Sequence, residues 1–129
     1  KELMVTWILW ALILAMLAWM GFNYLRIRRA AKIVDNEEFE SLIRTGQLID
    51  LRDPAEFHRK HILGARNIPS SQLKTSLAAL RKEKPVLLYE NQRAQRVTNA
   101  ALYLKKQGFS EIYILSYGLD SWKGKVKTN

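Results

Sequence analysis

Residues 48–57 read LIDLRDPAEF, and the stretch begins with a short apolar run of strand type at residues 48–51. A second run of this type, PVLLY, covers residues 85–89, and a third, IYIL, covers residues 112–115. Each run has the length of a buried strand and is too short for a membrane span or a long core helix. We therefore predict three buried strands in the C-terminal three quarters of the chain.

Segments with helical spacing separate these runs. Asp35 followed by Glu38 is typical of an N-cap with its capping-box partner, so we expect a short helix that ends near Gly46. Two further apolar stripes have helical spacing, and they consist of Leu73, Leu77 and Leu80, and of Val97, Ala100, Ala101 and Leu104. Short apolar strands that alternate with amphipathic helices predict an α/β domain with a largely parallel sheet.

The loop after the second strand is the place where we expect a binding site. In open parallel sheets, ligands bind beyond the carboxyl ends of the strands, and the free N–H groups at the start of the next helix attract anions. The segment in that position comprises Glu90, Asn91, Gln92, Arg93, Ala94, Gln95 and Arg96.

The composition excludes several kinds of site. The 129 residues include no cysteine, so the chain has no disulfide, no cysteine-ligated metal and no thiolate nucleophile. His58 and His61 lie three residues apart without a third ligand nearby, so we expect no metal and no cofactor. The net charge is +9, but the basic residues are scattered and lack interleaved aromatic residues, so we expect no nucleic-acid binding.

The N-terminal part carries the most apolar segment. Residues 3–25 contain no charged residue, and as a helix they are about 34 Å long, against about 30 Å for a bilayer core. Trp7, Trp10, Trp19 and Tyr24 lie toward its ends, as interfacial aromatic residues do. A cleaved signal peptide and a buried core helix are the alternatives, but bulky residues fill the end where a signal peptide needs small ones. We predict a transmembrane helix at residues 3–25 that contacts membrane lipid.

The residues that follow indicate the topology. We expect residues 26–34 to form a basic juxtamembrane linker, in which the basic residues are Arg26, Arg28, Arg29 and Lys32. Their position predicts a single-pass protein of the cell membrane, with its N-terminus outside and residues 35–129 in the cytoplasm as a domain. The same four side chains are candidates for binding anionic lipid headgroups; the alternative is a plain topology signal.

The part after the apolar segment resembles the rhodanese-like domain family. Residues 48–57 are similar to the family's first signature, an apolar strand followed by Asp-x-Arg and Glu-Phe, and residues 61–69 (HILGARNIP) to the stretch after it. Residues 108–122 are similar to its closing pattern. The resemblance covers about residues 33–126 and implies a parallel sheet flanked by helices on both faces. It implies structural roles for Asp50, Arg52, Glu56, Phe57, His61, Gly64, Ala65, Asn67, Ile68 and Pro69.

The chain departs from this family at the residue that carries the chemistry. Active rhodaneses hold sulfur as a persulfide on a cysteine that opens the loop after the fourth strand, because the transfer needs a thiolate. An ungapped alignment through residues 87–89 puts Glu90 in that position. The loop is also one residue longer, and Gln92 and Arg93 replace small residues. The resemblance therefore implies a member without catalytic residues.

Two questions stay open at the level of sequence. The Glu90 carboxylate either accepts N–H groups of the loop in place of the persulfide or points into solvent. For the function, we expect a catalytically inactive, membrane-tethered module that acts as an adaptor or regulator and binds a membrane or membrane-proximal protein. We expect an acidic or phosphorylated group of that partner protein to bind Arg52, Arg59, Arg93 and Arg96. The alternative is a sulfurtransferase by family analogy, which the lack of cysteine disfavours.

Overall fold

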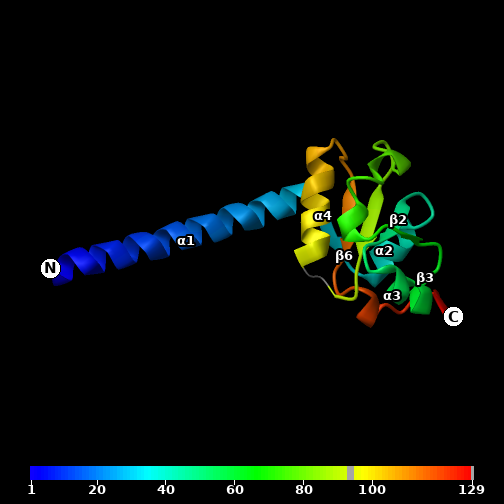
Figure 1. Ribbon diagram of the computed structural model, residues 1–129, viewed down its shortest axis with the longest axis horizontal. Helices are drawn as coiled ribbons and strands as arrows, with labels where there is room; N and C mark the ends of the chain where they lie inside the picture. Colours follow the sequence, from blue (N-terminus) through cyan, green and yellow to red (C-terminus); the bar gives the residue numbers. More distant parts are fainter. Residues whose placement is uncertain (93–94, 129) are drawn as a thin grey trace.

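The structure, a computed structural model, describes residues 1–92 and 95–128 (Figure 1). Its elements in chain order are α1 (Glu2–Ala30), β1 (Lys32–Val34), α2 (Asn36–Leu42), β2 (Gln47–Asp50), α3 (Pro54–Arg59), β3 (Lys60–Ile62), β4 (Arg66–Asn67), η1 (Ser70–Gln72), η2 (Leu77–Ala79), β5 (Val86–Tyr89), α4 (Gln95–Lys106), β6 (Ile112–Leu115), η3 (Leu119–Ser121) and β7 (Val126–Thr128).

Five parallel strands form the main sheet, in the order β1-β6-β5-β2-β4. The apolar strand β5 lies in the centre, and its last residue, Tyr89, is in register with Asp50, the last residue of β2. A small antiparallel pair, β3 and β7, lies outside this sheet. The predicted α/β domain with a parallel sheet is confirmed.

Successive side chains of β5 point to opposite faces of the sheet, so the strand contributes to a hydrophobic core on each face. Val86 and Leu88 pack with the apolar stripe of α4, whereas Leu87 and Tyr89 pack with Phe39 of α2. All four β5 residues are fully buried, as expected for a central strand covered on both sides. The prediction of helices on both faces is therefore confirmed.

The segment that contains Leu73, Leu77 and Leu80 does not form an α-helix, so the helix expected from their spacing was wrong. Two 3₁₀ turns, η1 and η2, take its place. Leu73 and Leu80 are buried and Leu77 packs against the same core. The spacing therefore reflects burial on one side of an irregular segment, and not a continuous helical backbone.

The expected linker at residues 26–34 is also wrong. Residues 26–30 continue α1, and residues 32–34 form the edge strand β1, which pairs with β6 in the register Lys32↔Tyr113 and Val34↔Leu115. The reason is apolar burial: Ala30, Ala31 and Val34 are buried in the domain. The apolar helix is thus joined to the sheet without a free segment between them.

The helix α1 is long and apolar enough to cross a membrane, and none of its most apolar stretch is buried within this chain. A signal sequence near an N-terminus, or the core helix of a soluble protein, can be as long and as apolar by the same measure. In Figure 1, α1 runs away from the domain as a single rod, and its end lies beside α4, with which it is in contact.

Candidate functional site

The candidate site lies at the carboxyl ends of β2 and β5. Because these strands are parallel and in register, Asp50 at the end of β2 and Glu90 just after β5 come to the same edge of the sheet. Helix α3 follows β2 and forms one wall. An open pocket of about 420 Å³ lies here, lined by Arg52, Glu56, Arg59, Lys60, Asn91, Leu119 and Asp120.

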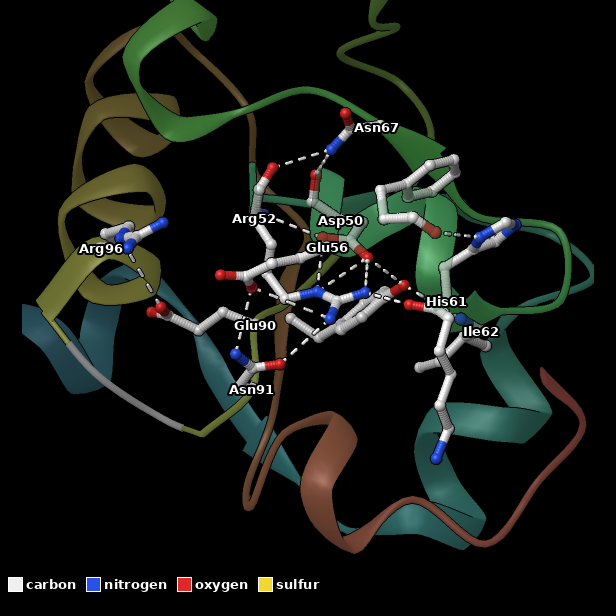
Figure 2. Close-up of polar contacts among 12 residues, drawn as sticks. Asp50, Arg52, Glu56, His61, Ile62, Asn67, Glu90, Asn91 and Arg96 are labelled. Carbon is white, nitrogen blue, oxygen red and sulfur yellow. Dashed lines mark hydrogen bonds and ion pairs between the residues drawn. The ribbon is translucent and has the colours of Figure 1, made fainter. Parts of the chain in front are cut away.

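A buried ion pair between Asp50 and Arg52 adjoins this pocket (Figure 2). Asp50 is 0% exposed and Arg52 is 5% exposed. The Nη2 atom of Arg52 donates to Oδ2 of Asp50 at 2.9 Å, and its Nε lies 3.1 Å from Oδ1. The backbone N–H of Arg52 also donates to Oδ1, at 2.8 Å. Burial by itself lowers the pKa of Arg52, but the hydrogen bonds and charge of Asp50 raise it above the usual value.

Tyr89 completes the pairing of the Asp50 carboxylate. Its hydroxyl donates to Oδ2 of Asp50 at 2.6 Å and accepts the backbone N–H of Ile62 at 3.1 Å. Burial raises the pKa of Tyr89, and the neighbouring Asp50 charge raises it further, so the phenol stays neutral. The sequence showed Tyr89 only as the end of an apolar strand; its register with Asp50 is what gives it this role.

The outer end of Arg52 also bonds groups of the protein. Its Nη1 donates to Oδ1 of Asn91 at 3.1 Å, and its Nη2 donates to the carbonyl of Lys60. Glu56 lies 3.9 Å from Nη1 and accepts from Nδ2 of Asn91 at 3.2 Å. Four of the five N–H donors of Arg52 therefore bond groups of the protein itself, although its side chain still lines the pocket.

The other signature residues hold the same loops in place. Nδ2 of Asn67 donates to the carbonyls of Asp50, at 3.2 Å, and Arg52, at 2.9 Å. The ring of His61 stacks on Phe57, with the ring centres 3.8 Å apart, and its Nδ1 lies 2.7 Å from the Phe57 carbonyl. Gly64 has a positive φ of 92° in the turn after β3. In residues 1–92 and 95–128, no cluster of three or more His, Asp and Glu could hold a metal ion.

Glu90 points inward and not into solvent. It is only 7% exposed, and its Oε2 accepts the backbone N–H of Val97, the third residue of α4, at 2.9 Å. Nε of Arg96 lies 4.0 Å from Oε1 (Figure 2). The solvent-facing alternative is thus wrong. One N–H group in the first turn of α4, where an external anion would bind, is thus taken by the protein's own carboxylate.

Residues 90–92 of the loop are tied to the segment after β6. The backbone N–H groups of Leu119 and Asp120 donate to the carbonyls of Glu90, at 2.8 Å, and Asn91, at 3.0 Å. Nε2 of Gln92 lies 3.3 Å from Oδ2 of Asp120. Gln95 does not reach the pocket, because its amide bonds Asn99 on the next turn of α4. The candidate residues Arg93 and Ala94 lie outside the described residues.

Gly118 allows the segment after β6 to lie close to the backbone of Glu90 and Asn91. This role of Gly118 was not recognised in the sequence. Its φ is +69°, and a Cβ atom there would collide with the backbone of Glu90 and Asn91. The sequence signal was its place in the closing pattern at residues 118–122. Lys60 is the other addition, because it stands where a glycine is usual in the resembled family and puts a cation at the pocket.

Comparisons with known proteins agree with the fold. The model of the rhodanese-like domain family matches residues 35–125. The chain is 46% identical over 113 residues to the protein named uncharacterized protein YqhL of Bacillus subtilis (strain 168), covering 88% of this chain and 89% of that protein. It is 34% identical over 95 residues to thiosulfate sulfurtransferase GlpE of Stutzerimonas stutzeri (strain A1501), covering 71% and 84%.

A solved structure supports the same architecture. The crystal structure of a rhodanese-related protein from Thermoplasma volcanium superimposes with a TM-score of 0.68 at 22% identity. The superposition covers 76% of this chain and 99% of that one. At this identity the likeness concerns the fold alone. The part of the chain that it leaves out is close in size to the apolar helix α1.

Proposed function

Because this chain belongs to the rhodanese-like domain family, we propose that it is a non-catalytic member. We further propose that α1 tethers it to a membrane, where the pocket beside Asn91 binds an acidic group of a membrane or membrane-proximal protein. The observation that carries the first part is Glu90, whose buried carboxylate is bonded by the start of α4. It stands where the resemblance puts the cysteine of the active members.

The lack of catalysis follows from chemistry. Sulfane sulfur is passed on by attack of a thiolate, and the sequence contains no cysteine to supply one. The Glu90 carboxylate also fills the place at the α4 N-terminus that a bound thiosulfate would need for its negative charge. The alternative, a sulfurtransferase, is favoured only by the likeness to proteins of that name.

A sulfurtransferase assay separates the two functions. We expect the full-length chain, purified in neutral detergent, to form thiocyanate from thiosulfate and cyanide no faster than a reaction without protein. The Glu90→Cys variant should stay inactive too, because Gln92 keeps the loop bulky and tied to Asp120. A thiosulfate sulfurtransferase run in parallel is the positive control. Turnover by the natural chain above the blank would contradict the proposal.

Two cationic side chains at the pocket form no ion pair with the described residues of the protein. Arg59 and Lys60 are exposed, line the pocket, and form no ion pair within residues 1–92 and 95–128. Leu119 adds an apolar wall. A volume of about 420 Å³ is within the range of ligand pockets. Arg59, one of the four arginines to which the sequence assigned this role, and Lys60 therefore suit a carboxylate or phosphoryl group.

Capture from native membranes tests this surface. Proteins bound by the immobilised full-length chain should be retained about tenfold less by the Arg59→Ala/Lys60→Ala variant, because two charge-assisted bonds are lost. The matched control, Lys82→Ala/Lys84→Ala, removes the same charge from the segment before β5, at the opposite edge of the sheet. It should retain the natural set. Equal retention by both double variants would show that this pocket is not the interface.

The membrane tether rests on α1 and on the charges after it. The uncharged run ends at Leu25, and Arg26, Arg28 and Arg29 follow on the same helix. This order favours a domain in the cytoplasm and an N-terminus outside. A domain held at the inner face of the cell membrane has a raised effective concentration toward membrane proteins. A partner in or near the membrane is therefore the kind that this arrangement suits best.

A further inference from the structure

A second pocket lies between α1 and α4, far from the site described above. Its volume is about 410 Å³, and it is formed where the end of α1 passes the end of α4 (Figure 1). Four apolar side chains line it, Phe22, Leu25, Ala30 and Leu102. Four cationic side chains line it as well, Arg26, Arg29, Lys105 and Lys106.

Helical spacing explains why these residues meet. Phe22, Leu25, Arg26 and Arg29 recur at three- and four-residue intervals and so share one face of α1. Leu102, Lys105 and Lys106 share one face of α4 in the same way. On both helices the apolar residue precedes the cations. The pocket therefore combines an apolar wall with cationic side chains from both helices.

The cations of this pocket have no acidic partner in the part of the chain that the structure describes. None of the four forms an ion pair among the described residues, and no acidic side chain lines the pocket. The other two basic residues near α1 are engaged elsewhere: Arg28 bonds the Tyr24 hydroxyl at 3.2 Å, and Lys32 pairs with Glu38 at 3.5 Å. Four like charges around one cavity are unfavourable unless an anion lies between them.

The position along α1 identifies the kind of anion. The uncharged run ends at Leu25, so Phe22 and Leu25 belong to the membrane part of α1, and Arg26 and Arg29 to its surface part. A pocket at this level meets both acyl chains and headgroup phosphates. A soluble anion would use the cationic side chains and leave the apolar wall exposed.

We propose that this pocket binds one anionic phospholipid of the inner leaflet. Its phosphate lies among the four cations, and an acyl chain lies along Phe22, Leu25 and Leu102. This inference rests on the proposed membrane tether. It adds α4, through Lys105 and Lys106, to the headgroup contacts for which the sequence offered Arg26, Arg28, Arg29 and Lys32, and so fixes the domain against the membrane surface.

Native mass spectrometry of the full-length chain in neutral detergent tests the proposal. We expect one phosphatidylglycerol molecule to be retained in preference to phosphatidylcholine. The Lys105→Gln/Lys106→Gln variant should bind phosphatidylglycerol about tenfold or more weakly. The control, Lys123→Gln/Lys125→Gln, removes the same charge from the exposed C-terminal segment and should bind like the natural chain. Equal binding of the two lipids, or an unchanged Lys105/Lys106 variant, would overturn the proposal.

Two further measurements keep the outcomes distinct. Inorganic phosphate at millimolar concentration should not displace the lipid, and displacement would mean a site for free phosphate instead. Separately, alkaline extraction of cell membranes tests the tether: release of the chain would refute the membrane location. Retention of the chain without selective lipid binding would refute only the lipid pocket. Thermal unfolding of each variant checks that the domain is intact.

Discussion

Replacing Asp50 with alanine is expected to lower the free energy of unfolding of the domain by about 3–5 kcal/mol, which is the usual cost of removing one partner of a buried ion pair. The substitution leaves the guanidinium of Arg52 buried without its counter-charge, and it leaves the hydroxyl of Tyr89 without its acceptor. Since domains of this size are stable by about 5–15 kcal/mol, the loss is a large share of the total. Urea unfolding of the detergent-solubilised chain, followed by near-ultraviolet circular dichroism, measures it.

Two variants show whether the buried charge is the cause. Asp50→Asn keeps the volume but not the charge, and should cost nearly as much as alanine because Arg52 is still unpaired. Glu83→Ala breaks the exposed pair with Arg81, 4.0 Å apart, and should change the stability by no more than about 0.5 kcal/mol. If Asp50→Ala lowered the free energy of unfolding no more than Glu83→Ala does, the buried ion pair would not stabilise the domain.

The sequence predicts those parts of the fold that depend on neighbouring residues. Asp35 accepts the N–H of Glu38 at 2.9 Å, as the capping pattern indicates, and α2 begins at the next residue. The apolar stripe of α4 is buried as its spacing predicts. These features are local, because the residues that cause them lie within four positions of each other.

The parts that were missed depend on distant residues. Residues 32–34 look like a basic linker until β6 offers a parallel edge to pair with. Arg52 looks available to a ligand until Asn91, 39 residues away, bonds it. Chain order alone does not indicate which of several carboxylates and amides a buried arginine meets. The sequence therefore brings the candidate residues to one end of the sheet but does not indicate which of their charges are paired.

For Glu90, part of the role can be predicted from the sequence, and part depends on the three-dimensional structure. The sequence gives its identity and its place after β5, and from these the loss of thiolate chemistry follows. Which group its carboxylate meets depends on where α4 begins, and Val97 is the residue whose N–H lies within reach. A carboxylate at this point stabilises the helix terminus as an N-terminal acidic residue does. The loop that is catalytic in active members thereby has a structural use.

Replacing Gly118 with alanine is expected to destabilise the domain by about 3 kcal/mol or more. With φ at +69° and ψ at −167°, this residue lies in a region that essentially only glycine adopts, which costs other residues about 1–3 kcal/mol. A Cβ would in addition collide with the backbone of Asn91, which is not free to move because Asp120 bonds its carbonyl. Amide hydrogen exchange at Leu119 and Asp120 should therefore become faster, along with a lower urea midpoint.

Gly64 supplies the matched control. It also has a positive φ, 92°, but a Cβ there meets nothing within 4 Å. Gly64→Ala thus introduces backbone strain alone, whereas Gly118→Ala adds a collision with the candidate site. We expect Gly64→Ala to be the milder variant and to leave exchange at Leu119 and Asp120 unchanged. Equal loss of stability in both would mean that close packing of residues 118 and 91 does not hold the pocket wall in place.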